Sequence, residues 1–133
     1  MSERTIVMIV DDDESVRRAA RRLLKSYGFA VETFASADEF LTSGRLAETA
    51  CLVLDVHMPG MSGLELQTHL VTLGVTIPIV FITAFANELA RSQALESGAC
   101  CYLIKPFDED DLFNCIQRAL HTDAATPGGN PPS

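Results

Sequence analysis

The chain has no tryptophan and only nine other aromatic residues, two tyrosines and seven phenylalanines, among its 133 positions. It also has no apolar run near the roughly 20 residues that a membrane-spanning helix needs. We therefore expect no membrane segment. A signal-peptide pattern is missing as well, because Met1-Ser2-Glu3-Arg4 leads directly into a short strand-like segment. The cytoplasm is the expected location.

Basic residues are scarce compared with acidic ones. Lysine and arginine total 10 against 18 aspartates and glutamates, which gives a formal net charge of -8. This balance argues against a nucleic-acid-binding surface on this domain. The length suits one domain with a real core, which we place at residues 1–122. From Thr122 the composition shifts to small residues and proline, so residues 123–133 are expected to be a flexible tail or the start of a linker.

No CxxC pair occurs among the four cysteines, which are Cys51, Cys100, Cys101 and Cys115. The three histidines are scattered, so the spacing of a structural zinc site is absent. Adjacent cysteines such as Cys100 and Cys101 are poorly placed to pair with each other. We therefore expect buried thiols in a reducing compartment.

Five strand-like segments alternate with five helical patterns. The strands are expected at 5–10, 29–34, about 50–54, 77–82 and 100–104, and the helices follow Asp13, Ser36, Ser62, Asn87 and Asp108. Such alternation predicts an α/β fold with a parallel sheet and helices on both faces. We expect the flavodoxin-like (βα)5 doubly wound arrangement, with strand order 2-1-3-4-5.

Reactive side chains stand where four of these strands end. Asp11 and Asp12 follow the first strand, Asp55 the third, Thr83 the fourth and Lys105 the fifth. The carboxyl ends of parallel strands meet at one edge, where such sheets bind ligands. We therefore expect all five side chains in one crevice.

Three carboxylates in one crevice repel one another unless a cation lies among them. Oxygen ligands of this kind suit Mg²⁺, which usually shares its coordination with phosphate oxygens. The ammonium group of Lys105 and the hydroxyl of Thr83 would add donors for a phosphoryl group. Asp55 is the central carboxylate, and its attack on phosphorus would give an aspartyl phosphate.

At this point the sequence resembles the receiver (CheY-like) domain of two-component response regulators. The resemblance spans about residues 4–121, and its specificity comes from the order and spacing of several short motifs. These motifs are Val10-Asp11-Asp12, Asp55 with Met58-Pro59-Gly60 and Ser62-Gly63, Thr83-Ala84, and Lys105-Pro106-Phe107.

The resemblance implies a role for each residue of the crevice. Asp55 would be the phosphoacceptor, Asp12 a direct Mg²⁺ ligand and Asp11 a ligand through water, and the backbone carbonyl of His57 would complete the metal site. Thr83 and Lys105 would contact the phosphoryl oxygens, and the peptide bond between Lys105 and Pro106 would be cis.

The resemblance also implies a switch and its partners. On phosphorylation Thr83 and Tyr102 would move, and the face formed by the fourth helix, fifth strand and fifth helix would change its partner preference. The expected partners are a sensor histidine kinase or phosphotransfer protein, an output partner or fused output domain, and a second copy in a phosphorylation-dependent homodimer. His57 and Phe85 should flank the acyl phosphate, and our hypothesis is that Phe85 hinders water and lengthens its lifetime.

Other interpretations stay open from the sequence. A Mg²⁺-dependent phosphohydrolase of the halo-acid-dehalogenase type would use a DxD pair, a spacing that Asp11 and Asp13 have, although no cap domain is evident. A binding module without phosphorylation is a third possibility, against which the intact set of crevice residues argues. The basic face of the first helix is either a solvated surface or a docking face for a phosphodonor; it comprises Arg17, Arg18, Arg21, Arg22 and Lys25.

Overall fold

The computed structural model describes residues 6–124. Its strands are β1 (Ile6–Val10), β2 (Ala30–Phe34), β3 (Thr49–Asp55), β4 (Ile79–Thr83) and β5 (Cys101–Ile104). Its helices are α1 (Glu14–Ser26), α2 (Ala37–Thr42), α3 (Gly63–Thr72), α4 (Glu88–Glu96) and α5 (Glu109–Ala124), with a 3₁₀ turn, η1, at Leu46–Glu48. The five strands form one parallel sheet in the order β2-β1-β3-β4-β5. The predicted flavodoxin-like topology is confirmed.

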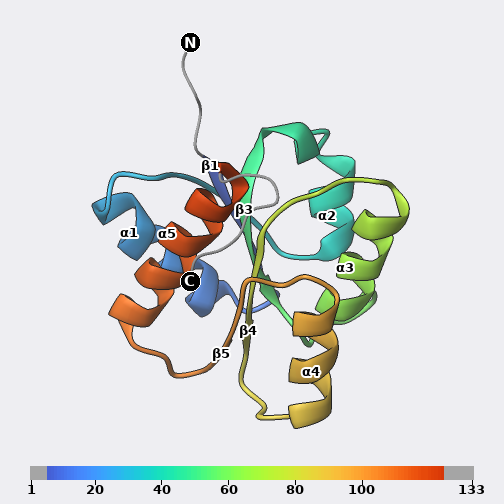
Figure 1. Cartoon of the computed structure of the whole chain (residues 1–133). Helices are drawn as coiled ribbons and strands as arrows, with labels where there is room; N and C mark the ends of the chain where they lie inside the picture. The colour runs from blue at the N-terminus through green and yellow to red at the C-terminus, as the bar shows by residue number, and fades with distance from the viewer. Residues whose placement is uncertain (1–5, 125–133) are drawn as a thin grey trace.

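Helices cover both faces of this sheet (Figure 1). Helices α1 and α5 lie on one face, and α2, α3 and α4 lie on the other. Each face has its own apolar cluster, because the strands are buried on both sides and carry apolar side chains at successive positions. The carboxyl edge of this buried sheet carries the loops after β1, β3, β4 and β5.

Side chains at the helix ends fix where several helices begin. The Asp13 carboxylate accepts a hydrogen bond from the amide of Ser15 at 2.9 Å, and Asn87 caps α4 through the amide of Ala90 at 3.0 Å. The predicted capping box of Ser62 and Glu65 is present at the start of α3. These caps set the direction in which each loop leaves the sheet edge.

The two helices beside β5 pack with different side chains. Helix α5 buries the large residues Leu112 and Ile116 completely. Helix α4 reaches the sheet through Ala90 and Ala94, while Leu89 is 69% exposed. The packing of α4 is therefore shallower than that of α5, as its lack of large inward residues predicts.

One prediction about the cysteines is wrong. Cys101 and Cys115 form a disulfide between β5 and α5, whereas Cys51 and Cys100 are free thiols. The pairing arises because the connection after β5 turns the chain back, so that α5 crosses over the strand and the two Cα atoms lie 6.1 Å apart. No local sequence spacing signals such a contact between a strand and a helix.

Helix α5 continues to Ala124, two residues past the predicted domain boundary at residue 122. The rest of the predicted tail lies outside the described residues. Within residues 6–124, none of the helices has both the length and the apolar character needed to cross a membrane.

Candidate functional site

Three carboxylates meet at the carboxyl edge of the sheet. Asp11 and Asp12 directly follow β1, Asp55 is the last residue of β3, and these two strands are neighbours. One oxygen from each carboxylate lies within 4.8 Å of the other two. Asp11 is fully buried and Asp55 nearly so, whereas Asp12 is exposed at the mouth. This spacing allows a divalent cation to be shared by all three.

Lys105 and Thr83 complete the crevice from the next two strands. The ammonium Nζ of Lys105 lies 3.1 Å from Asp11 Oδ2 and 3.8 Å from Asp55 Oδ2. The amide of Lys105 donates to the carbonyl oxygen of Thr83 at 2.7 Å, and the peptide bond between Lys105 and Pro106 is cis. Thr83 is fully buried at the end of β4. The structure therefore brings together the side chains of Asp11, Asp12, Asp55 and Lys105, as the strand ends predict, and the backbone of Thr83 is bound to that of Lys105.

Backbone amides hold two of the carboxylates in place. The amide of His57 donates to Asp55 Oδ1 at 3.2 Å, and the amide of Asp13 donates to Asp11 Oδ1 at 2.8 Å. The second oxygen of each carboxylate faces the ammonium group of Lys105. Asp55 is thus oriented by its own loop on one side and by a cation on the other.

Gly63 permits the loop after β3 to close tightly. Its amide donates to the carbonyl oxygen of Val56 at 2.9 Å, and a Cβ at this position would clash with the carbonyl oxygen of Asp55. Only glycine can approach the backbone this closely. The first residue of α3 therefore packs directly against the backbone of Asp55.

The charge balance of the crevice is unfavourable for Asp55. Burial raises the pKa of its carboxyl from 3.8 to about 6, and the neighbouring charge of Asp11 acts in the same direction. The ammonium group of Lys105 and the amide of His57 oppose this rise in pKa without cancelling it. An added cation would favour the ionised form of Asp55, which is the nucleophilic one.

Arg17 contacts this site, although its place in the sequence predicts only a part in the basic face of α1. Its Nη1 donates to the carbonyl oxygen of Asp11 at 2.8 Å. The contact ties the first turn of α1 to the loop that carries the acidic pair. The available signal was its position four residues after the helix cap Asp13, where a long side chain folds back over the turn.

Tyr102 lies on β5 beside α4, away from the carboxylates. Its ring centroid is 6.2 Å from that of Phe81, and it packs against the cluster on the α2–α3–α4 face. The hydroxyl is buried and has no hydrogen-bond partner among the described residues, and burial raises its pKa. An unpaired buried hydroxyl costs free energy, so a second position for this side chain with a partner would be favoured.

His57 and Phe85 each lie two residues after a crevice residue, Asp55 and Thr83 respectively. Both side chains are exposed, and their rings meet edge to face with centroids 5.2 Å apart. The amide of His57 is bound to Asp55, and that of Phe85 donates to Thr83 Oγ1 at 3.1 Å. The backbone of each aromatic residue is therefore bound to the side chain of a crevice residue.

The side chain of Asp13 lies outside the group of three carboxylates, which argues against the DxD pair of a phosphohydrolase of the halo-acid-dehalogenase type. Its side chain caps α1 through the amide of Ser15 and is exposed. It is not part of the carboxylate group formed by Asp11, Asp12 and Asp55. The spacing of Asp11 and Asp13 thus has a local structural explanation.

Comparison with known families gives one clear match. The sequence model described as "Response regulator receiver domain" matches residues 7–117. Nodulation protein W of Bradyrhizobium diazoefficiens is 42% identical over 122 residues, and response regulator protein TodT of Pseudomonas putida is 41% identical over 121 residues. These alignments cover 92% and 90% of this chain but only 54% and 53% of the relatives, so the chain spans about half of their length.

Solved structures give the same result. The response regulator StyR has a TM-score of 0.86 at 47% identity, over 92% of this chain and 62% of that one. The structure titled FixJ-N has a TM-score of 0.81 at 35% identity, over 91% of this chain and 96% of that one. The similarity therefore extends over the whole sheet and its helices.

Proposed function

Because this chain belongs to the family of response regulator receiver domains, a family of phosphoacceptor signalling switches, we propose that Asp55 is the residue that accepts the phosphoryl group. One observation carries the assignment: Asp55 is the central carboxylate of the crevice, with one oxygen bound to the His57 amide and the other facing Lys105. A carboxylate oxygen of Asp55 attacks phosphorus, and the bond from phosphorus to the donor nitrogen or oxygen breaks.

The donor set of the crevice fits Mg²⁺. Asp12 and Asp55 would bind the ion directly, Asp11 through a water molecule, and the backbone carbonyl of His57 would add a further oxygen. The ion supplies positive charge for the phosphoryl oxygens when it is bound. Lys105 contributes a second positive charge beside Asp55, and Thr83, buried at the end of β4, would donate its hydroxyl to the phosphoryl group.

A small phosphodonor tests this assignment directly. The full chain incubated with acetyl phosphate and Mg²⁺ should gain the mass of one phosphoryl group, and peptide mapping should locate it at Asp55. Asp55→Asn, or wild type with a chelator, should gain none. Modification of Asp55→Asn to the same extent as wild type would disprove the assignment.

An aryl phosphate ester separates a switch from an enzyme. A receiver is modified once and turns over no external substrate, whereas a phosphohydrolase releases product continuously. We expect no sustained hydrolysis of a generic aryl phosphate ester by the full chain. A binding module without phosphorylation would give neither product nor a gain in mass.

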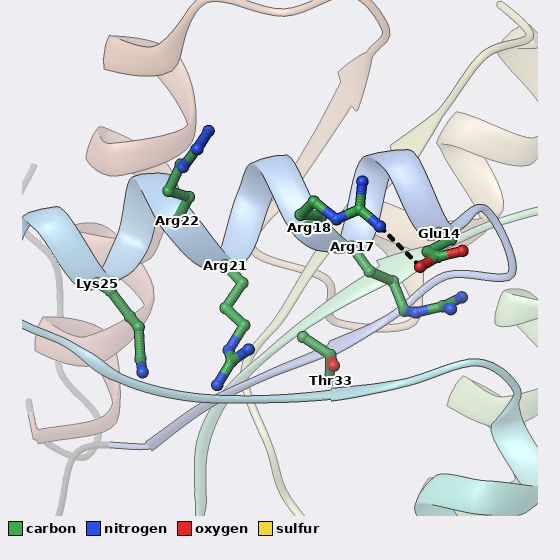
Figure 2. Close-up of a pocket in the computed structure, with 7 residues that line it drawn as sticks. All are labelled: Glu14, Arg17, Arg18, Arg21, Arg22, Lys25 and Thr33. Carbon is green, nitrogen blue, oxygen red and sulfur yellow. Dashed lines mark hydrogen bonds and ion pairs between the residues drawn. The ribbon is translucent and has the colours of Figure 1, made fainter.

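Helix α1 is the docking surface that we propose for the phosphodonor, either a sensor histidine kinase or a phosphotransfer protein. Its basic side chains and Thr33 of β2 line a groove of about 460 Å³. Figure 2 shows Arg17, Arg21 and Lys25 extending from α1 towards β2, and Arg18 and Arg22 extending from its other side. Arg18 pairs with Glu14 at 2.8 Å, while in the described part of the chain Arg21, Arg22 and Lys25 form no ion pair. A cationic surface close to the crevice would attract an acidic partner and orient its phosphohistidine.

Charge reversal tests this surface. Arg18→Glu with Arg22→Glu should slow transfer from a phosphorylated histidine phosphotransfer domain and leave modification by acetyl phosphate unchanged. Equal transfer to the double variant and to wild type would rule out docking on α1.

The output of the switch is assigned to the face formed by α4, β5 and α5. Phosphorylation shifts Thr83 and Tyr102, and this face then binds an output partner, a fused output domain or a second copy of the chain. Tyr102 supports this proposal because its hydroxyl is buried and has no hydrogen-bond partner within residues 6–124. We place the protein in the cytoplasm, where ATP-dependent kinases supply phosphoryl groups. Light scattering before and after phosphorylation tests for the homodimer.

A further inference from the structure

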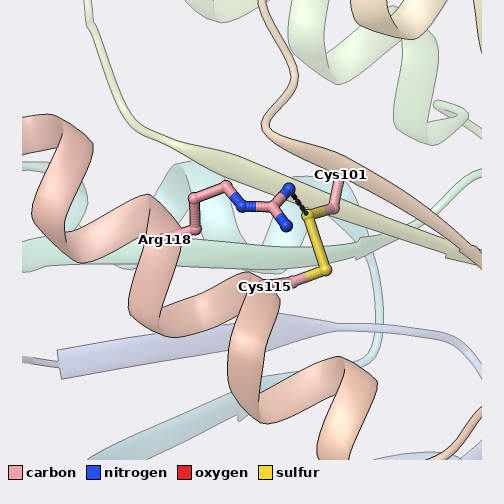
Figure 3. Close-up of a disulfide and its surroundings, with 3 residues drawn as sticks. All are labelled: Cys101, Cys115 and Arg118. Atoms are coloured by element: carbon pink, nitrogen blue, oxygen red, sulfur yellow. Dashed lines mark hydrogen bonds between the residues drawn. A yellow bond between two sulfur atoms is a disulfide. The ribbon is translucent and has the colours of Figure 1, made fainter. Parts of the chain in front are cut away.

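A covalent bond joins β5 to α5 at a distance from the acidic crevice. Cys101 is the first residue of β5 and Cys115 lies within α5, as Figure 3 shows. The two residues are only 7% and 6% exposed. Neither has a part in phosphoryl transfer, so the pair needs a separate explanation.

Arg118 places a positive charge against one of the two sulfur atoms. Its Nη1 lies 3.4 Å from Cys101 Sγ, and it reaches there from the same helix as Cys115 (Figure 3). A guanidinium group at this distance favours the thiolate form of Cys101 once the bond is reduced. It also attracts an incoming thiolate to the Cys101 sulfur while the bond is intact. This environment promotes thiol exchange.

A groove gives reagents access to the pair. It has a volume of about 400 Å³ and is lined by residues of α4, β5 and α5, among them Arg91, Asn114 and both paired cysteines. Cys100 also lines it as a free, half-buried thiol whose pKa is raised by burial. A small thiol compound can therefore approach the bond from this side.

We propose that Cys101 and Cys115 form a reversible redox-modification site, in which the disulfide restrains α5 against β5 and the dithiol form lacks this restraint. In a reducing compartment a disulfide is transient and serves as a sensor. Tyr102 directly follows Cys101, so the bond restrains the strand that carries the proposed switch residue. The effect on signalling rests on the proposed function, in which α4, β5 and α5 form the output face.

Oxidation requires an acceptor of two electrons, and a small organic disulfide such as oxidised glutathione supplies it. The Cys101 thiolate attacks one sulfur of this reagent, releases one thiolate and forms a mixed disulfide. Cys115 loses its proton to water and attacks Cys101 Sγ, which releases the second thiolate. Two protein thiols become one disulfide, and the reagent becomes two thiols after protonation. Reduction by excess thiol is the reverse sequence.

Counting thiols tests the site itself. The full chain is equilibrated at increasing ratios of oxidised to reduced glutathione, quenched with acid and alkylated with a maleimide in denaturant, and its mass is measured. Wild type should change from four alkylated cysteines to two, with Cys51 and Cys100 labelled in the oxidised form. Cys100→Ser should keep the loss of two thiols, and Cys101→Ala should abolish it. Cys115→Ser should instead lose one thiol and gain the mass of one glutathione, because the mixed disulfide at Cys101 is not resolved. Four labelled cysteines at every ratio would overturn the proposal.

Arg118 provides a test that a purely structural disulfide would not pass. Arg118→Gln should slow oxidation and reduction several-fold and shift the pH dependence of oxidation to higher pH. Arg91→Gln removes an equal charge from the same groove without contacting the sulfur, and it should leave both rates nearly unchanged. Equal effects of the two substitutions would overturn the role of Arg118 in the site.

Amide hydrogen exchange tests the mechanical effect. Amides of residues 112–120 should exchange more slowly in the oxidised form than in the reduced form, and equal rates would overturn the restraint. Phosphorylation with acetyl phosphate should change their exchange more in the reduced form. If neither form is phosphorylated, the proposed function fails while the thiol count still decides this site. If both are phosphorylated with identical changes, the link to the output face is overturned.

Discussion

The core under α5 and the acidic crevice differ in what burial does to each of them. Under α5 the buried side chains are mostly aliphatic, and their removal from water stabilises the fold. In the crevice the same sheet buries Asp11, Asp55 and Thr83, and the pKa of Asp55 is raised because its charge is poorly solvated. Stability is therefore concentrated in the first region and reactivity in the second.

The largest effect is expected in the core. Leu112→Ala removes a fully buried side chain and should lower the free energy of unfolding by about 2–5 kcal/mol. Leu89→Ala, on the neighbouring helix α4, removes a side chain that is 69% exposed and should change it by less than about 0.5 kcal/mol. Urea unfolding under reducing conditions measures both. Similar losses would contradict the difference in packing between α4 and α5.

Gly63 lies where the two regions meet. Gly63→Ala should cost about 1–3 kcal/mol, because the new Cβ displaces the backbone of Asp55. The rate of phosphorylation by acetyl phosphate should fall as well. Gly74→Ala is the matched control: it has a positive φ of 76° and open space around it, and should cost about 1 kcal/mol with no change in that rate. Unchanged phosphorylation of Gly63→Ala would show that the close packing is not needed.

In the absence of metal, Asp55→Asn should raise the free energy of unfolding, whereas Leu112→Ala and Gly63→Ala lower it. The folded-state pKa of about 6 lies above the ordinary 3.8, so the native protein binds more protons between these values and loses stability as pH rises through them. Asparagine removes this loss and should stabilise the fold by about 1–2 kcal/mol above pH 6, less than the full shift because water reaches the crevice mouth. The gain should fade towards pH 4.

Thermal unfolding in a chelator at pH 8 and pH 4 checks this prediction. Asp38→Asn, a neutral replacement of an exposed carboxylate on α2, serves as control and should show little change at either pH. Mg²⁺ should stabilise wild type, because the ion binds only the folded crevice. The difference in thermal stability between wild type and Asp55→Asn should therefore become smaller. A gain that is the same at both pH values would exclude the charge of Asp55 as its source.

The contrast between core and crevice also explains what the sequence could predict. Parallel strands align their carboxyl ends, so the positions of Asp11, Asp55, Thr83 and Lys105 followed from the strand assignments alone. Apolar runs likewise predicted the sheet and its two covered faces. Both inferences use backbone geometry that repeats in every fold of this class.

Contacts between side chains of distant elements were not predictable in this way. The bond of Cys101 to Cys115 depends on how α5 crosses β5, and the reach of Arg17 to the Asp11 carbonyl depends on one side-chain conformation. The exposure of Leu89 has the same origin, because a helix of nine residues with small inward side chains can satisfy its pattern in more than one orientation. Tertiary packing decides each of these.

Substitution of Phe85 is expected to have the smallest effect on stability and to change the rate of phosphate loss instead. Its side chain is 61% exposed and meets the His57 ring edge to face, so substitution should change the free energy of unfolding by less than about 0.5 kcal/mol. Phe85→Glu removes an apolar cover and adds a carboxylate that can orient water. We expect phosphate loss from phosphorylated Asp55 to accelerate by up to about tenfold, which corresponds to ~1.4 kcal/mol of activation free energy. Phe85→Leu keeps an apolar side chain and should stay within about twofold of wild type. Release of phosphate measured after removal of the phosphodonor decides the matter, and equal rates for wild type and Phe85→Glu would end the hypothesis that this ring shields the acyl phosphate.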